Sequence, residues 1–468
     1  MTAGSLGTLR ETVDLAFSAP PGSAEGVYAA TWGQREMWRT IARHRPGGFY
    51  QLSQIIPVGA PVGLGTALAC LRQLVVRHAS LRTTFQEDAG GLYQVIHRDG
   101  VLPVLVQEAP AEDRERATAA ALVAAFQAEE PLLDREFAPR LAVVTRGGAA
   151  TYLVLVCSHV VLDGHSERVL ASEARTLLAH ATATTERTSA VPPPLPPVVH
   201  GPAEQAGVEA RARSRRTSAR SVAHWRATLA DAPPALFPSP TEPVDGGPGA
   251  PVWCGRLASG ALAEAEAALV RSGLGSSALW LSATARVLAA RTGRPAMAFR
   301  LPVSNRFDQA LDGYVGNLSQ HTVVTVDTAC GTFPELARRV ERDLMRAYFH
   351  ARYDPAELAE ATTDIETRRG APLDLTYLFN DVRSQRDKRP APTRPPARPP
   401  EVTWELLHSA NSDIKLHIRV TENAGRPLLD IAADTSCLPR SAITDALFAV
   451  ERLLVEAARE AGPRSFGG

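Results

Sequence analysis

This sequence has very little lysine and no net charge. Lysine occurs only at Lys388 and Lys415, and arginine supplies the remaining positive side chains. Fifty lysine and arginine residues balance 50 acidic ones, which gives a formal net charge of zero. A balanced chain offers no electrostatic footprint for nucleic acid or for an anionic membrane surface. We therefore expect neither of these as a partner.

Cysteine is also scarce, and its distribution argues against a thiolate metal site or a disulfide framework. The five cysteines are widely separated: Cys70, Cys157, Cys254, Cys330 and Cys437. Zinc sites and disulfide-rich folds need short paired spacings, which this set lacks. An odd, scattered set is typical of a reducing compartment, so we expect a cytoplasmic protein without a bound metal.

Long apolar runs are absent as well. Glu11 and Asp14 interrupt the N-terminal segment where a secretory signal would need an apolar core. No stretch approaches the ~18 apolar residues of a membrane span. Neither the serine elbow of hydrolases nor a glycine-rich phosphate loop occurs. We expect a soluble protein that holds no cofactor of its own.

The length of the chain predicts two lobes. One hydrophobic core rarely supports 468 residues. After residue 182 the composition shifts to proline, alanine, serine, threonine and arginine, including the proline-rich run 191–197, which excludes regular helix or strand. We predict an N-terminal lobe over 1–182, a linker over 183–220 and a C-terminal lobe over 221–468.

Apolar periodicity predicts helices and strands in both lobes, which gives an α/β fold. In the first lobe we expect helices over 64–75 and 117–128 and strands over 141–144 and 152–156. In the second we expect helices over 261–270, 277–290, 333–349 and 441–461, and strands over 252–257, 322–326, 373–379 and 414–420. The proline- and arginine-rich stretch 387–400 is predicted to be a mobile surface loop.

The segment with most chemical content is Ser158-His159-Val160-Val161-Leu162-Asp163-Gly164. It follows an apolar strand and precedes a helical pattern, for which Ser166 is the expected N-cap. Gly164 permits a tight turn that exposes the imidazole of His159, while Asp163 can hold neighbouring structure in place. His159 is therefore a candidate general base, although the spacing alone also fits an ordinary surface turn.

Four further segments occur along the chain in the order of the motifs of one family, the condensation domains of nonribosomal peptide synthetases. Thr31–Trp38 resembles Ser-x-Ala-Gln-x-Arg-Leu/Met-Trp, and Arg77–Phe85 resembles Arg-His-Glu-x-Leu-Arg-Thr-x-Phe. Leu301–Arg306 is similar to Pro-x-Ala-Asn-Arg, and Asp312–Leu318 to Ile-Gly-x-Phe-Val-Asn-Thr. Ser158–Gly164 itself resembles His-His-x-x-x-Asp-Gly. The resemblance covers nearly the whole chain.

The resemblance implies a fold and a set of residue roles. The fold would be α/β, with two chloramphenicol acetyltransferase-like lobes in a V-shaped arrangement, a substrate tunnel between them and a latch-like segment near 312–320. His159 would act as the base, because it takes the position of the second histidine of the family motif. Asp163 would form a structural ion pair with Arg306 of the other lobe. Gly164 would supply the turn, with a backbone N–H for the oxyanion as an additional role.

Several positions depart from the family pattern or leave their role open. Ser158 replaces the first histidine of the motif, and Glu36 and Ala79 replace an arginine and a glutamate. The Ser158 hydroxyl either binds the acceptor substrate or is a buried group satisfied by the backbone. Asn317 either closes over the tunnel or caps a turn. His165 lies on the helix side of the motif and is not a favoured catalyst.

Two functions follow from these observations. The first is a freestanding acyltransferase that forms an amide or ester in natural-product biosynthesis, including antibiotic synthesis. A carrier protein in trans, or coenzyme A, would present the acyl thioester, and a small amine or alcohol would accept it. Epimerisation of a tethered residue is a related variant. The second is a non-catalytic module that recruits a carrier protein or a tailoring enzyme. We expect a monomer in either case.

Overall fold

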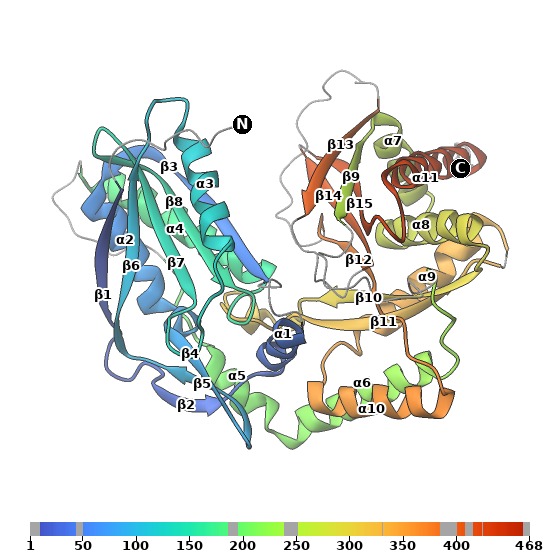
Figure 1. The fold of residues 1–468 in the computed structure, drawn as a ribbon, viewed down its shortest axis with the longest axis horizontal. Coiled ribbons are helices and arrows are strands. Elements are labelled where there is room, and N and C mark those ends of the chain that lie inside the picture. Colours follow the sequence, from blue (N-terminus) through green and yellow to red (C-terminus); the bar gives the residue numbers. More distant parts are fainter. Residues whose placement is uncertain are drawn as a thin grey trace, which may run out of the picture. The chain divides into compact units, whose positions relative to one another are not determined.

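The computed structural model describes residues 10–43, 50–185, 195–237, 251–329, 331–383, 400–407, 415–423 and 425–461 (Figure 1). These residues form two compact units, and neither is one continuous stretch of sequence. Unit 1 draws on Met1–Arg45, Phe49–Ser214 and Ser304–Ser319, and unit 2 draws on Pro46–Gly48, Arg215–Val303 and Gln320–Gly468. No helix among the described residues is long and apolar enough to cross a membrane.

Unit 1 is built on a five-stranded sheet with the order β1-β6-β7-β8-β3. Its strands are β1 (Arg10–Ser18), β3 (Gln51–Gly63), β6 (Asp99–Glu108), β7 (Pro139–Arg146) and β8 (Ala149–Ser158). Only β6 and β7 pair in parallel; the other neighbours are antiparallel. β8 therefore lies inside the sheet, next to the edge strand β3, and its last residue ends the strand where the candidate motif begins.

Helices cover both faces of this sheet. α2 (Leu64–Arg77) and α4 (Gly164–Thr185) bury the larger apolar core, and α3 (Glu115–Gln127) packs on the opposite face. Beside the sheet lie α1 (Trp32–Arg43), α5 (Pro202–Glu209), the short helix η1 (Ala79–Arg82) and a small sheet of β2 (Gly26–Ala29), β5 (Gly91–Ile96) and β4 (Thr83–Asp88). β7 and β8 carry near-continuous apolar runs because both faces of the sheet are buried along them.

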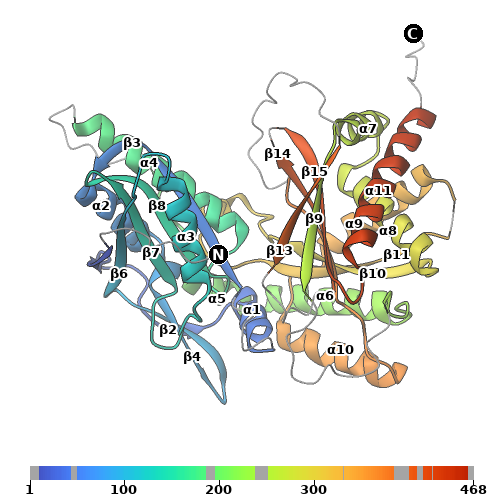
Figure 2. The ribbon, with the colours of Figure 1, turned by 45° about the horizontal axis from the view of Figure 1, so that its top comes forward.

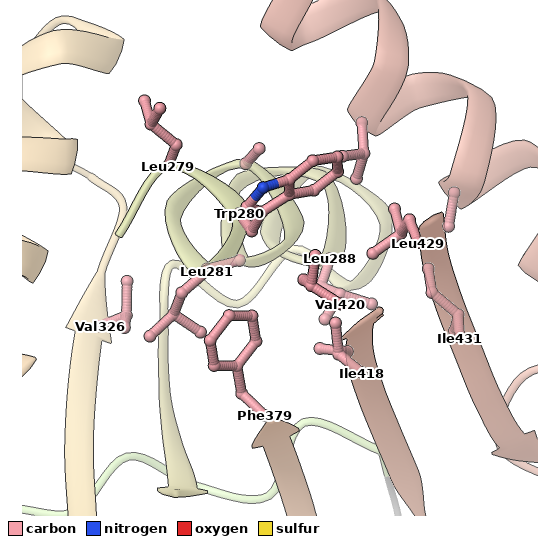
Figure 3. Close-up of a cluster of buried hydrophobic side chains, with 14 of the residues drawn as sticks. Leu279, Trp280, Leu281, Leu288, Val326, Phe379, Ile418, Val420, Leu429 and Ile431 are labelled. Carbon is pink, nitrogen blue, oxygen red and sulfur yellow. The ribbon is translucent and has the colours of Figure 1, made fainter. Parts of the chain in front are cut away.

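Unit 2 is built on a seven-stranded sheet with the order β11-β10-β12-β14-β15-β9-β13. Its strands are β9 (Val252–Ala258), β10 (Ala296–Val303), β11 (Gln320–Asp327), β12 (Tyr377–Asp381), β13 (Glu401–Leu407), β14 (Leu416–Asn423) and β15 (Arg426–Asp434). One face is buried under α7 (Gly260–Arg271), α8 (Ser276–Thr292), α9 (Phe333–Tyr348) and α11 (Arg440–Ala461), which lie together on that side (Figure 2). Figure 3 shows Trp280 and Leu281 of α8 above Phe379 and Ile418 of the strands.

The other face of this sheet is covered differently. α6 (Ala212–Leu229) and α10 (Pro355–Arg369) pack over its β10 and β11 end, where Trp225 and Tyr353 meet Val323. Over β9, β14 and β15 that face carries charged and polar side chains, among them Arg256, Arg419 and Asp430, beside small and apolar ones. The sheet therefore has one apolar, buried face and one partly polar face.

The structure departs from the sequence predictions between the lobes. α4 continues to Thr185, and α5 and α6 occupy much of the predicted linker 183–220. The helix α6 forms because Val222, Trp225 and Leu229 recur at helical spacing and are buried together. Residues 186–194, which hold most of the proline run, and 384–399, which hold the predicted loop apart from its last residue, lie outside the described residues.

The segment Ser304–Ser319 is the least expected element of the fold. It joins β10 to β11, which pair side by side in the sheet of unit 2, yet it belongs to unit 1. The segment contains η2 (Gln309–Leu311), and its Leu311, Tyr314 and Leu318 form a small buried cluster of their own. Residues that the sequence assigns to the second lobe thus become part of the first compact unit.

Candidate active site

His159 sits in the turn between β8 and α4. Its backbone N–H donates to the carbonyl of Tyr50 at 2.8 Å, and the N–H of Val161 donates to the carbonyl of Ser158 at 3.1 Å. Val160, Val161 and Leu162 are fully buried, whereas His159 is partly exposed. Three buried apolar side chains directly after the histidine anchor the turn in the core, so the imidazole is presented from a rigid support.

Asp163 caps α4. Its Oδ1 accepts the backbone N–H of Ser166 at 2.9 Å, and the N–H of Glu167 donates to the Asp163 carbonyl at 3.1 Å, the first bond of the helix. The prediction that Ser166 is the N-cap is therefore wrong. Both residue types are good caps, and the helix begins three residues earlier because the Ser166 hydroxyl is used elsewhere.

Asp163 also forms a buried ion pair with Arg306. The Arg306 Nη1 donates to Asp163 Oδ2 at 2.6 Å, and the two side chains are only 3% and 2% exposed. Burial alone would raise the pKa of Asp163. The charge of Arg306 and hydrogen bonds from Arg306, Ser166 and Leu318 outweigh burial and hold the pKa below its ordinary value. Asp163 is therefore an ionised structural carboxylate with no proton to exchange near neutral pH.

The Ser304–Ser319 segment is fastened to this carboxylate at several points. The N–H of Leu318 donates to Asp163 Oδ2 at 3.0 Å. The Ser166 hydroxyl donates toward Asp163 Oδ1 or the Gly316 carbonyl and accepts the Gly316 N–H at 3.0 Å. Arg306 Nη2 donates to the carbonyls of Tyr314 and Gly316 at 3.3 and 3.2 Å. Although Arg306 was expected to reach across from the other lobe, it belongs to the compact unit of Asp163.

Asn317 connects this segment to the backbone of His159. The buried Asn317 Nδ2 donates to the His159 carbonyl at 2.7 Å and to the Gly33 carbonyl at 3.2 Å, and its Oδ1 accepts the N–H of Ser319 at 3.0 Å. A Cβ at position 33 would collide with the Asn317 carbonyl, so the close approach requires Gly33. Asn317 thus caps a turn, one of its two expected roles, and also holds His159.

Ser158 faces the protein interior. It has no exposed surface, and its Oγ accepts the backbone N–H of Val160 at 3.3 Å. A serine hydroxyl that binds the backbone two residues on stabilises a turn locally. The geometry favours the interpretation of Ser158 as a buried hydroxyl satisfied by the backbone.

His165 and His78 are both held in structural networks. His165 Nε2 lies 2.8 Å from the Asp312 carbonyl and Arg168 donates to Nδ1 at 3.1 Å, an arrangement that fixes the neutral tautomer. Burial lowers the pKa of His165 below its ordinary value, which agrees with a neutral ring. His78 is buried, with its Nε2 2.7 Å from Glu173. Both rings therefore take part in hydrogen bonds that hold the fold.

Comparison with known proteins now identifies the family. The family model of the condensation domain matches residues 24–459. The chain belongs to the condensation domain family. Phosphinothricin tripeptide synthetase PhsB of Streptomyces viridochromogenes is 28% identical over 405 residues, which cover 83% of this chain and 33% of PhsB. The condensation domain described here therefore spans about a third of that curated relative.

Solved condensation domains share the fold. The domain for chain release from the enacyloxin polyketide synthase superposes with a TM-score of 0.67 at 20% identity, covering 96% of this chain and 86% of that one. A mutant starter condensation domain of rhizomide synthetase, in complex with C8-CoA, gives 0.70 at 18% identity, covering 93% and 96%. The predicted α/β fold of the chloramphenicol acetyltransferase type is confirmed for this condensation domain.

The structure brings most of the predicted residues together. His159, Asp163, Gly164 and Arg306 meet at the start of α4, with Asn317 bound to the backbone of His159. Sequence reasoning missed the hydroxyl of Ser166 and the N–H of Leu318 as partners of Asp163. The bond from Ser166 is local to the first turn of α4, whereas the bond from Leu318 depends on the tertiary position of Ser304–Ser319, which the local sequence of α4 does not signal. Among the described residues no group of three or more histidine, cysteine or acidic side chains could hold a metal ion.

Proposed function

We propose that this condensation domain is an acyltransferase that forms an amide or ester bond, with His159 as its general base. The supporting observation is that Asp163 and His159 make different kinds of contact at the turn. Asp163 is committed to Arg306 and to the helix cap, and the turn around His159 is fixed by bonds at both its N–H and its carbonyl. This arrangement supports the imidazole as the titratable side chain of the motif that exchanges a proton.

The proposed reaction uses His159 as the base. An amine or hydroxyl attacks the thioester carbonyl carbon and forms the new C–N or C–O bond. As it attacks, one imidazole nitrogen of His159 takes its proton, and the carbonyl electrons move onto oxygen. The tetrahedral intermediate then collapses, the C–S bond breaks, and the thiol leaves with the proton returned by the imidazolium. The Gly164 N–H, at the start of α4, is the proposed donor to the oxyanion.

The donor is proposed to be an acyl thioester on the phosphopantetheine arm of a carrier protein or on coenzyme A. Membership in the condensation domain family supports a thioester donor. The similar starter domain of rhizomide synthetase binds C8-CoA, which supports the second form. Relatives such as PhsB act in tripeptide synthesis, and we propose a place in the biosynthesis of antibiotics or related natural products.

Intact-protein mass spectrometry tests the proposal. Carrier proteins encoded near the gene, and coenzyme A, are loaded with candidate acyl groups and incubated with amine or alcohol acceptors. We expect loss of the acyl mass and a matching amide or ester product with wild-type protein. His159→Ala should lower transfer by roughly 10²–10⁴-fold while the protein stays folded. His350→Ala, a partly exposed histidine of unit 2, is the matched control and should retain activity.

A different result would favour the second function. Near-wild-type transfer by His159→Ala would refute the base assignment. If every acyl group remains on its carrier while wild-type protein binds one loaded carrier tightly, the domain is a recruitment module. Ser158, Glu36 and Ala79, which depart from the family motifs, are the residues that make this alternative worth measuring.

A further inference from the structure

One face of the seven-stranded sheet carries a cluster of charged side chains that belongs to unit 2, whereas His159 belongs to unit 1. Along β14, Leu416, Ile418 and Val420 point into the apolar core, so the alternate residues His417, Arg419 and Thr421 lie on the opposite face. The strand register places Asp430 of β15 opposite Arg419, and Arg256 of β9 opposite Asp430.

Arg256 and Arg419 share one carboxylate. Arg256 donates from Nε and Nη2 to Asp430 at 2.8 and 3.0 Å, and Arg419 donates from Nε and Nη2 at 3.1 and 2.8 Å. Asp430 is 2% exposed, whereas the arginine side chains are 37% and 35% exposed. Two guanidinium groups on one carboxylate leave one positive charge uncompensated within the trio, and the Nη1 groups of both arginines have no partner in the described parts of the chain.

Polar atoms beside the trio also lack partners. The Nε2 of His417 and the Oγ1 of Thr421 are buried and bind nothing among the residues that the structure describes. Buried polar groups are normally satisfied, so such atoms mark the place of a ligand or water. Burial, followed by the charge of Arg419, lowers the pKa of His417 to about 4, which agrees with a positive potential on this face.

The surrounding charges both add to the positive potential and oppose it. Arg300 on β10 and His321 on β11 act on His417 in the same direction as Arg419, and Asp430 acts against them. The acidic Glu405 of β13 lies near Arg256 and weakens its attraction for an anion.

We propose that this face binds an oxyanion, the carboxylate or phosphate group of a small molecule, between Arg256 and Arg419. The free Nη1 groups supply charge-assisted hydrogen bonds, which are the strongest that proteins offer to such groups. The Thr421 hydroxyl and His417 ring lie to either side along β14 and complete the polar surroundings. The ligand is a small molecule that carries such a group, and its binding does not depend on the proposed acyl transfer.

Calorimetric titration of the full chain with succinate and, separately, inorganic phosphate tests the site. We expect saturable binding, and the tighter of the two probes identifies the carboxylate or phosphate form. Arg256→Gln or Arg419→Gln should weaken binding roughly tenfold or more, since each removes a charged donor. Arg226→Gln is the matched control, because Arg226 also pairs with an aspartate, Asp364, on unit 2 and should leave binding unchanged.

Two further measurements separate a binding site from a purely structural trio. Glu405→Gln removes the nearby negative charge and should tighten binding about two- to fivefold. Saturation with the anion should raise the pKa of His417. This pKa is measured by NMR on protein with labelled histidines, and the signal that is missing in His417→Gln is assigned to His417. The proposal is overturned if neither succinate nor phosphate binds saturably. It is also overturned if the wild type and both arginine variants bind equally well. These outcomes do not depend on the acyl-transfer assay, so failure of the proposed function remains distinguishable.

Discussion

Asp163 Oδ2 accepts a hydrogen bond from Arg306 Nη1 at 2.6 Å, and its Oδ1 accepts one from the backbone N–H of Ser166 at 2.9 Å. One buried carboxylate therefore both caps α4 and binds the Ser304–Ser319 segment. These contacts give Asp163 a structural role that is separate from the chemistry proposed for His159. The separation makes the two residues experimentally distinguishable.

Replacement of Asp163 by alanine is expected to destabilise the fold. The substitution leaves the charge of Arg306 buried without its partner, which costs about 3–5 kcal/mol in comparable sites. Urea unfolding should show a large drop in the free energy of unfolding for Asp163→Ala, while Asp134→Ala, at an exposed pair with Arg135, should leave it nearly unchanged. A fully stable but inactive Asp163→Ala protein would instead assign this carboxylate a direct chemical role.

The sequence predicted the turn at His159 because its signal is local. An apolar strand, a glycine at the turn and a periodic helix suffice to place the histidine between β8 and α4. The N-cap could not be predicted in this way, because Asp163 and Ser166 are equally good caps and the choice depends on Gly316, 150 residues away. Arg306 was predicted as a partner by family resemblance, but its membership of unit 1 depends on the tertiary path of its segment.

Helices α6 and α10 are absent from the sequence predictions for different reasons. α6 lies in a stretch rich in alanine, arginine and serine, and that composition obscured the apolar stripe that its packing reveals. α10 was missed although Asp354 caps it, Pro355 opens it and Gly370 ends it in a left-handed conformation. These are ordinary helix boundaries, so local sequence contained the signal for α10.

The buried Glu167 predicts a loss of stability as the pH rises. Burial raises its pKa from 4.5 to about 7, although hydrogen bonds from Gln54 and Ser53 oppose the shift. Between these two values the folded protein keeps a proton that the unfolded chain releases, so unfolding becomes easier with increasing pH. The full effect is about 3 kcal/mol above pH 7.

Glu167→Gln removes this titration and tests it directly. Compared with wild type, the variant should gain stability progressively from pH 5 to pH 8 in urea unfolding, because it has no buried carboxyl to ionise. The exposed Glu136→Gln variant should follow the wild-type curve. Parallel curves for wild type and Glu167→Gln would show that this carboxyl titrates like an exposed one.

The bond between Ser158 and Val160 predicts a structural effect with little effect on catalysis. Ser158→Ala removes one neutral hydrogen bond from a fully buried turn, which should cost about 1 kcal/mol of unfolding free energy. The transfer rate should stay within a few-fold of wild type, measured by the mass-spectrometric assay. A loss of turnover comparable to that of His159→Ala, with unchanged stability, would place the hydroxyl on the acceptor substrate.

Asn317 should act on turnover through the position of His159. Its Nδ2 is a buried donor to the His159 carbonyl at 2.7 Å, and Asn317→Asp replaces that donor with an acceptor of the same shape. A carboxylate oxygen facing the carbonyls of His159 and Gly33 repels both, so the turn that carries the imidazole should shift. Small misplacements of a catalytic group cost up to about 10²-fold in rate.

The kinetic signature identifies this role. Asn317→Asp should lower kcat with a smaller change in KM, and Asn317→Ala, which loses the donor without the repulsion, should fall between Asn317→Asp and wild type. Asn423→Ala, at the exposed end of β14, is the control for replacement of an asparagine. If Asn317→Asp loses stability but its folded fraction turns over at the wild-type rate, Asn317 holds the segment together without positioning His159. A fall in kcat at unchanged KM shows that the backbone bond at His159 sets the rate of transfer.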